Sequence, residues 1–237
     1  MDRRDFLRLC ASAGALLAAG PHVFAADAAP RHYARVRLVA EDGTALRADG
    51  LEIGRNYVFH YPFAATPCFL LNLGRPTAAP TSLTTESGRR YRWSGGVGPH
   101  RSIVAYSAIC AHQMAHPTRQ VSFIAYRHGP GATAGKAAPG VITCCANNSV
   151  YDPAQGARVL SGPAGQPLAA ILLEHRAADD ALFAVGTFGG EMFESFFEQF
   201  AERLGLEYGS PLKARQPVTA TAVVLPLERF SATQMIC

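Results

Sequence analysis

The chain has 237 residues, of which 49% are hydrophobic and 17% are charged, and this balance excludes an intrinsically disordered protein. Its net charge of +4 is too small to indicate nucleic-acid binding, and no run of Lys and Arg accompanies it. A chain of this length can bury a substantial core in one or two domains.

The N-terminus has the pattern of a twin-arginine export signal over residues 1–25. Arg3 and Arg4 are followed by an apolar stretch over residues 9–19 and by small residues before Ala26. This stretch is about half the ~20 residues that span a bilayer, so we expect cleavage. The alternative is an uncleaved segment that associates the protein with the membrane. Either way the sequence predicts a periplasmic protein that is exported folded, often around a cofactor.

Short apolar segments rich in β-branched and aromatic residues predict strands from residue 32 to residue 188. We divide this part into an N-terminal β region, 26–96, and a central domain, 97–188. Residues 76–88 are predicted to be a polar turn region, and residues 128–140, rich in Gly, Pro and Ala, an inserted loop. Strands are expected at 33–39, 57–62, 68–73, 91–93, 103–106, 121–126, 141–143, 168–173 and 182–188.

The last region, residues 189–237, changes character. Apolar residues at i, i+3 and i+4 spacing over residues 191–204 predict one amphipathic helix. Residues 209–237 contain three prolines and are predicted to be an extended tail. The apolar positions of the helix are Met192, Phe193, Phe196, Phe197, Phe200 and Leu204.

Two short boxes carry the chemistry. Cys110-Ala111-His112 is the first, and the second begins at Cys144 and runs through Asn147 to Asp152. With the stretch that follows, through Gly162-Pro163, they resemble the two ligand loops of Rieske [2Fe–2S] proteins over residues 97–188. The resemblance implies a mostly β fold: an antiparallel β-sandwich with a smaller cluster-binding subdomain, to which the C-terminal helix and tail are added.

The resemblance also implies ligands for a [2Fe–2S] cluster. In this family two Cys thiolates bind one iron and two His imidazoles bind the other. Cys110 and Cys144 match the thiolates and His112 matches one imidazole. Asn147 stands where the second His is expected.

Residues around the second box match positions that surround the cluster in the family. Ser149 matches the residue whose hydroxyl bonds a bridging sulfide, and Tyr151 the one whose hydroxyl bonds a ligand Cys sulfur. Gly162-Pro163 matches the proline loop that covers the cluster. Asn148 falls where Gly is usual, and Asn is the non-Gly residue best suited to a left-handed backbone.

In this register the family's inter-loop disulfide would join residues 115 and 146, and both are Ala. Four interpretations of the fourth ligand remain open. The Asn147 oxygen or water binds iron weakly; Cys145 supplies a third thiolate; His116 replaces the imidazole; or the cluster is lost and the fold serves as a scaffold.

The other cysteines and histidines are not expected to take part in the cluster site. Cys68 lies in an apolar segment and is expected to be a buried thiol, and Cys237 is terminal and expected to be exposed. The sequence does not determine any disulfide pairing. His60, His100, His128 and His175 are interpreted as isolated surface or core residues.

The sequence therefore predicts a periplasmic Rieske-type electron-transfer subunit or shuttle that passes single electrons between redox partners. Its partner would be a redox protein or a larger oxidoreductase complex, and the chain would not be catalytic alone. The alternative is a cluster-free structural subunit of such a complex.

Overall fold

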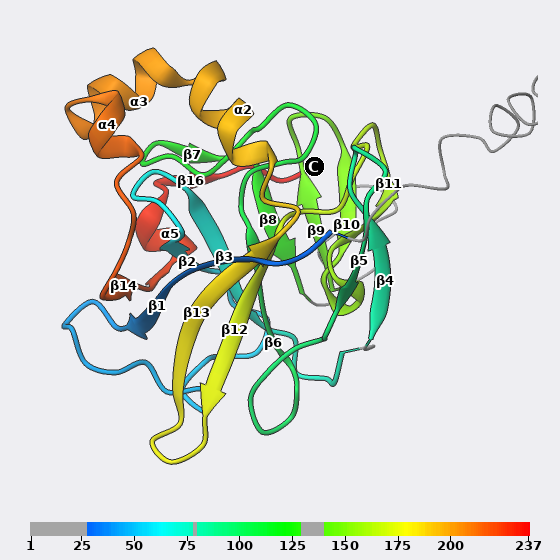
Figure 1. Ribbon diagram of the computed structural model, residues 1–237, viewed down its shortest axis with the longest axis vertical. Coiled ribbons are helices and arrows are strands. Elements are labelled where there is room, and N and C mark those ends of the chain that lie inside the picture. The colour runs from blue at the N-terminus through cyan, green and yellow to red at the C-terminus, as the bar shows by residue number, and fades with distance from the viewer. Residues whose placement is uncertain (1–27, 78–79, 129–139) are drawn as a thin grey trace, which may run out of the picture.

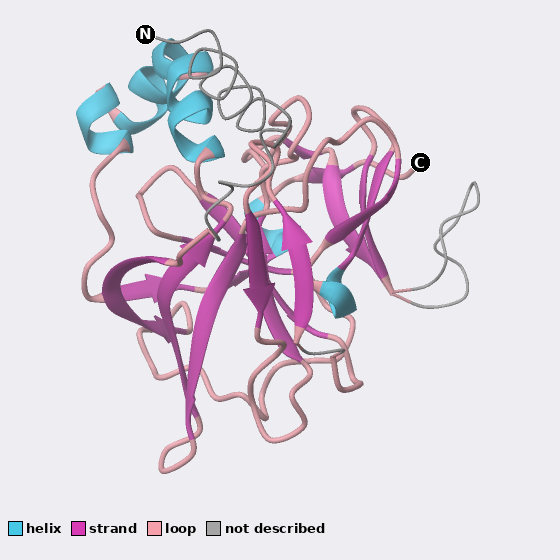
Figure 2. Ribbon diagram, turned by 45° about the vertical axis from the view of Figure 1, so that its right-hand side comes forward, coloured by secondary structure: helices cyan, strands magenta, loops and turns pink. Residues whose placement is uncertain are grey.

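The computed structural model describes residues 28–77, 80–128 and 140–237. The predicted export signal and most of the predicted inserted loop lie outside these residues. The predicted mostly β fold is confirmed: two main sheets lie side by side, with a group of short helices at one end (Figures 1 and 2). None of the described helices is long and apolar enough to cross a membrane.

The larger sheet has eight strands in the order β14-β1-β13-β12-β6-β3-β2-β15, antiparallel except for the parallel β1–β14 pair. Its end strands, β14 and β15, are consecutive in the chain with only Val224 between them. Because β14 also contacts β2, the sheet curls until its two ends approach. The bounds are β1 Arg31–Val39, β2 Tyr57–His60, β3 Pro67–Asn72, β6 Ile103–Ser107, β12 Ala170–Arg176, β13 Ala181–Phe188, β14 Thr221–Val223 and β15 Leu225–Pro226.

The smaller sheet forms the predicted smaller subdomain and has the order β11-β10-β9-β8. Two further pairs flank it, an antiparallel β4–β5 hairpin and a parallel β7–β16 pair. The bounds are β4 Thr81–Thr84, β5 Arg90–Trp93, β7 Val121–Ser122, β8 Ile124–Arg127, β9 Val141–Cys144, β10 Ser149–Asp152, β11 Arg158–Ser161 and β16 Thr233–Gln234, with a short 3-10 helix η2 at Pro153–Gln155.

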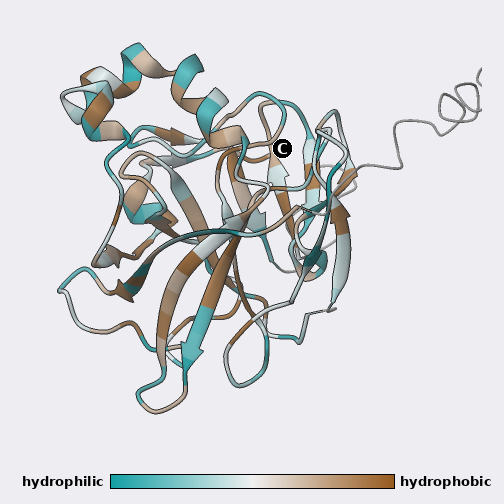
Figure 3. Ribbon diagram, in the orientation of Figure 1, coloured by the Kyte–Doolittle hydropathy of each residue, from teal (hydrophilic) through white to brown (hydrophobic). Residues whose placement is uncertain are grey.

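A shared core joins the two sheets. Tyr106 of β6 and Tyr151 of β10 are fully buried in one hydrophobic cluster, which also takes in Trp93 of the hairpin. The Tyr106 hydroxyl donates to the Pro153 carbonyl at 2.7 Å, which fixes the large sheet to the end of β10. Figure 3 shows the corresponding hydrophobic colouring on the strands where the sheets meet. The relative position of the two sheets is therefore set by side-chain packing and this hydrogen bond as well as by the segments of chain that connect them.

The predicted single helix is two helices, α2 (Met192–Gln199) and α3 (Ala201–Tyr208). The chain leaves helical geometry at Phe200, where φ is −109°. The apolar face of α2 is buried, as the spacing predicts, and packs against Ile109 in the first box's loop. The helix thus supports the loop that carries Cys110. The remaining helices are α4 (Pro211–Ala214) and α5 (Leu227–Phe230).

Two local expectations were wrong. The predicted polar turn region contains the strand β4, in which only Leu83 is buried, so it shows almost no hydrophobic alternation. The single strand expected over 121–126 is two strands in different sheets, β7 and β8. Between them the Phe123 carbonyl accepts the Cys145 backbone N–H at 2.6 Å.

The C-terminal tail is extended in part, but it is built into the fold. After β14 and β15 it forms β16 beside β7, and Cys237 is joined to Cys145 by a disulfide with a Cα–Cα distance of 5.5 Å. Cys237 is exposed, as expected, but its pairing with Cys145 could not be predicted from the sequence. The tail consequently connects the segment after the first box, at β7, with the second box, at Cys145.

Replacing Cys237 by Ser should lower the free energy of unfolding by about 2–4 kcal/mol, because the disulfide closes a sequence separation of 92 residues. Denaturant unfolding under non-reducing conditions measures this change. Ile236→Ser, at a neighbouring residue that is 73% exposed, is the matched control and should change stability little. Equal stability of Cys237→Ser and the native chain would show that the disulfide does not hold the tail.

Candidate functional site

The first box lies on a tight loop at the end of β6. The Cys110 backbone N–H donates to the Ala115 carbonyl at 2.9 Å, and the Met114 N–H donates to the Cys110 carbonyl at 2.9 Å. Met114 adopts a left-handed conformation, with φ at 56°, which closes this loop. Cys110 is fully buried, whereas His112 at the tip is exposed. The loop therefore presents a thiol inward and an imidazole outward.

The second box is the turn between β9 and β10. Cys144 ends β9 and pairs across the ladder with Ser149, the first residue of β10. The Asn148 N–H donates to the Cys144 carbonyl at 2.7 Å, and its φ of 59° confirms the left-handed backbone expected there. Asn148 therefore closes the turn that carries Asn147.

The two boxes bring their thiols together. Cys110 and Cys144 are both buried and free, and their thiols are close enough to influence each other's pKa. The thiol of Cys144 lowers the pKa of Cys110 to about 5, against the cost of burial, with further contributions from the Tyr151 hydroxyl, the Asn147 amide and the His112 backbone N–H. The thiol of Cys110 and burial raise the pKa of Cys144. The donors around the pair thus favour negative charge on Cys110 over Cys144.

Asn147 lies in the site and its side chain points at Cys110. Its Nδ2 donates to the Cys110 Sγ at 3.2 Å, and its Oδ1 accepts the Ser149 backbone N–H at 3.0 Å. One Oδ1 lone pair is therefore engaged, and a carbonyl oxygen has two. A donor placed on a sulfur atom stabilises negative charge there.

Tyr151 and Ser149 lie beside the thiol pair. The Tyr151 hydroxyl is 3.3 Å from the Cys110 Sγ and accepts the Ala111 N–H at 3.3 Å. Ser149 is 0% exposed, and its Oγ has no hydrogen-bond partner among the described residues. An unsatisfied buried hydroxyl costs about 1–3 kcal/mol. The site therefore contains a buried hydroxyl that the described parts of the chain leave without a partner.

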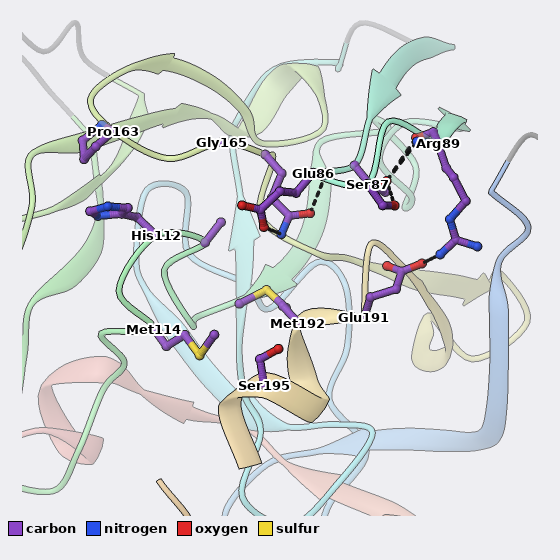
Figure 4. A pocket seen from close by; sticks show the side chains of 13 residues that line it. Glu86, Ser87, Arg89, His112, Met114, Pro163, Gly165, Glu191, Met192 and Ser195 are labelled. Carbon is purple, nitrogen blue, oxygen red and sulfur yellow. Dashed lines mark hydrogen bonds and ion pairs between the residues drawn. The ribbon is translucent and has the colours of Figure 1, made fainter. Parts of the chain in front are cut away.

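The segment after β11 packs directly on the second box. A Cβ at Gly162 would lie 2.5 Å from the Ser149 Cα and 2.6 Å from the Asn148 carbonyl oxygen, and Gly162 has a φ of 91°. Only glycine allows this approach. The next residue, Pro163, lies beside His112 (Figure 4), so this segment covers the site as the proline loop of the resemblance does.

Two of the alternative ligands predicted from the sequence are placed elsewhere. The Cys145 sulfur is bonded to Cys237 and is not a free thiolate. His116 is 8% exposed, and its ring packs edge-on against Phe196 and Phe200 of the helical region. Its Nδ1 is 2.9 Å from the Met114 carbonyl oxygen, and burial lowers its pKa. Neither residue is directed at the Cys110–Cys144 pair, because each already packs or bonds on another side.

A cavity of about 800 Å³ opens at His112 and Pro163 (Figure 4). Arg89 of the loop before β5 and Glu191 at the start of α2 form an ion pair on its wall. Sequence reasoning missed these lining residues, because they come from segments distant in the chain. The other lining residues are Thr85, Glu86, Ser87, Ala111, Met114, Gly165, Gln166, Met192 and Ser195.

The side chains of the two boxes can be compared with the ligands of a two-iron centre. In the described parts of the chain, no three His, Cys, Asp or Glu side chains converge on one point. A Rieske-type centre does not require this, since each of its irons takes two protein ligands. The thiol pair fits the cysteine-bound iron, and the unused Ser149 hydroxyl fits an acceptor beside Cys144. The residues present therefore fit the group, with Asn147 as the departure.

Comparison with known proteins finds similar solved structures. No family model matches the chain. The soluble domain of the Rieske protein II (soxF) from Sulfolobus acidocaldarius is similar over 65% of this chain and 78% of its own, with 25% sequence identity and a TM-score of 0.46.

Gly162→Ala should destabilise the protein more than Gly43→Ala. Both glycines have a left-handed φ, 91° and 81°, so both variants incur the backbone cost of about 1–2 kcal/mol. Only the methyl group at 162 meets other atoms, since nothing lies within 4 Å of a Cβ at Gly43. Denaturant unfolding should show a difference of at least about 1 kcal/mol between the variants. Equal losses would mean that the covering segment does not press on the second box.

Proposed function

We propose that this chain is a Rieske-type electron-transfer protein that holds a [2Fe–2S] cluster between its two boxes. The observation that carries the proposal is the Ser149 hydroxyl, which is fully buried, unpartnered and directly across the ladder from Cys144. A bridging sulfide is the acceptor that the resemblance assigns to this hydroxyl. A cluster would thus give the buried Ser149 hydroxyl an acceptor.

The thiolates of Cys110 and Cys144 would hold one iron, and His112 would serve the other. The remaining ligand would be the Asn147 Oδ1, through its second lone pair, or water. When bound, such a cluster supplies a one-electron redox couple. Its two thiolates are buried, while His112 is exposed, so electrons would enter or leave on the His112 side.

The protein's own residues would tune this site through their donors. The Tyr151 hydroxyl and the Asn147 amide both lie within 3.3 Å of the Cys110 sulfur. Donors to ligand sulfurs favour the reduced, more negative state and raise the reduction potential. Burial of the thiols also excludes water from them.

The partner would be a redox protein or a larger oxidoreductase complex that docks around His112. The cavity beside it, with Arg89 and Glu191 on its wall, offers a polar surface for such contact. The twin-arginine pattern supports a periplasmic location, soluble or membrane-associated. The chain would act as a subunit or shuttle and not as an enzyme by itself.

A cluster-free structural subunit is the second candidate, and Asn147 is the observation that favours it. Both ends of this amide already have partners within the protein, at Cys110 and at Ser149. The second box can therefore close without a metal. The two candidates differ in a single measurable property, the presence of iron and acid-labile sulfide.

Protein purified without air should contain iron and sulfide and show the EPR signal of a reduced [2Fe–2S] cluster. Cys110→Ser and Cys144→Ser should each lose the iron, because each removes a thiolate. They should also unfold at lower temperature, since a bound cluster contributes to folding.

Cys68→Ser is the matched control for this experiment. Cys68 is also a fully buried free thiol, but it lies in β3 and donates to the Tyr61 carbonyl at 3.0 Å. This variant should keep its iron. Iron-free native protein, or equal iron in all three variants, would overturn the proposal.

Asn147→His should strengthen cluster binding, because a neutral imidazole completes a set of two Cys and two His ligands. The variant should retain more iron during dialysis against a chelator and show a Rieske-type EPR signal. Asn148→His, one residue further along the turn, is the control and should gain nothing. A gain in Asn148→His alone would shift the second box by one residue, and no gain in either would favour the cluster-free subunit.

A further inference from the structure

A second cavity lies where the two ends of the large sheet approach each other. Its volume is about 420 Å³, and it shares no lining residue with the cavity at His112. Strand β2 forms one wall, and the C-terminal segment from Val218 through β14 to α5 forms the other. Cavities of roughly 300–1,000 Å³ with apolar walls and a few polar groups are typical small-molecule sites.

Most of the lining is apolar. Val58 and Phe230 are buried, and Val218 and Leu225 are partly buried against the wall. These side chains come from β2, the tail and α5, so the cavity exists only because the tail covers the sheet. Such a surface favours the hydrocarbon part of a ligand.

One positively charged side chain, Arg119, lines this cavity. The Arg119 guanidinium lies over the Phe230 ring, 4.8 Å from its centroid, and in the described residues no carboxylate pairs with it. Arg229, on the neighbouring α5, differs in this respect because it forms an ion pair with Glu41. An exposed arginine whose charge is not neutralised by the protein can bind a carboxylate through two parallel N–H donors.

His60 is the second polar group of the lining. Its ring packs on Phe230, with a centroid distance of 5.6 Å, and no described residue hydrogen-bonds its nitrogen atoms. Burial lowers the pKa of His60 to about 4, so the ring is neutral at pH 7 and offers one N–H donor and one acceptor. Arg119 is therefore the only positive charge among the lining residues.

We propose that this cavity binds a small organic monocarboxylate with an apolar chain. The carboxylate would pair with Arg119 and accept the His60 N–H, and the chain would lie against Val58, Leu225 and Phe230. The Arg119 guanidinium carries one positive charge and His60 is neutral, so the site suits a ligand with a single negative charge. The site does not involve the cluster ligands, so the proposal applies whether or not the protein binds a cluster.

Calorimetric titration of the full chain with sodium octanoate tests the proposal. We expect saturable binding with one octanoate per chain. Arg119→Gln should weaken the affinity at least tenfold, and Arg119→Lys, which keeps the charge, should weaken it less. Arg229→Gln is the matched control, because this arginine is outside the cavity. The variant should bind octanoate with the same affinity as the native chain.

Two further measurements separate the contribution of the ligand's charge to binding from that of the His60 side chain. Octanol, which lacks the charge, should bind at least tenfold more weakly than octanoate to the native chain but about equally to Arg119→Gln. His60→Phe should weaken octanoate binding while its melting temperature shows that it is folded. Absence of saturable octanoate binding to the native chain, or equal affinities of the native and Arg119→Gln proteins, would overturn the proposal.

Discussion

The structure depends on the C-terminal segment pairing with both edges of the large sheet. Residues 221–223 extend the sheet beside β1, and residues 225–226 extend it beside β2. An exposed sheet edge leaves a row of backbone donors and acceptors without partners, and this segment satisfies part of both rows. The same segment then reaches Cys145 through β16 and Cys237. One piece of chain thus closes the sheet, forms a wall of the second cavity and fixes the second box.

This arrangement bears on the two Ala residues at 115 and 146, where the resemblance implies an inter-loop disulfide. The backbone hydrogen bonds between residues 119–122 and the tail hold the segment that follows the first box. The bond from Cys237 to Cys145 holds the second box. The tail therefore links the two boxes, in addition to the direct hydrogen bond from Asn147 to Cys110. The Cys145–Cys237 disulfide restrains this part of the fold while residues 115 and 146 are Ala.

Much of the fold could be predicted from the sequence because its signals are local. Short apolar segments rich in β-branched and aromatic residues located most strands of the large sheet, and the left-handed turn at Asn148 was expected from its residue type. The strand β4 was missed because only Leu83 in it is buried. The break at Phe200 and the tail strands were missed because the partners that fix them are distant in the chain. The Cys145–Cys237 bond spans 92 residues, and no spacing rule predicts such a pairing.

The residues of the candidate site could be singled out from the sequence, but the hydrogen bonds that they make to Cys110 could not. Sequence reasoning placed Tyr151 and Asn147 near the cluster, but not both on the same sulfur. Around Cys110 the structure gathers a hydroxyl, an amide, a backbone N–H and a neighbouring thiol, and all of them favour a thiolate. Negative charge on a buried sulfur is costly unless that sulfur is hydrogen-bonded. The donors that favour it at Cys110 come from Asn147 and Tyr151, which are 37 and 41 residues away in the chain, so only the folded protein brings them to one atom.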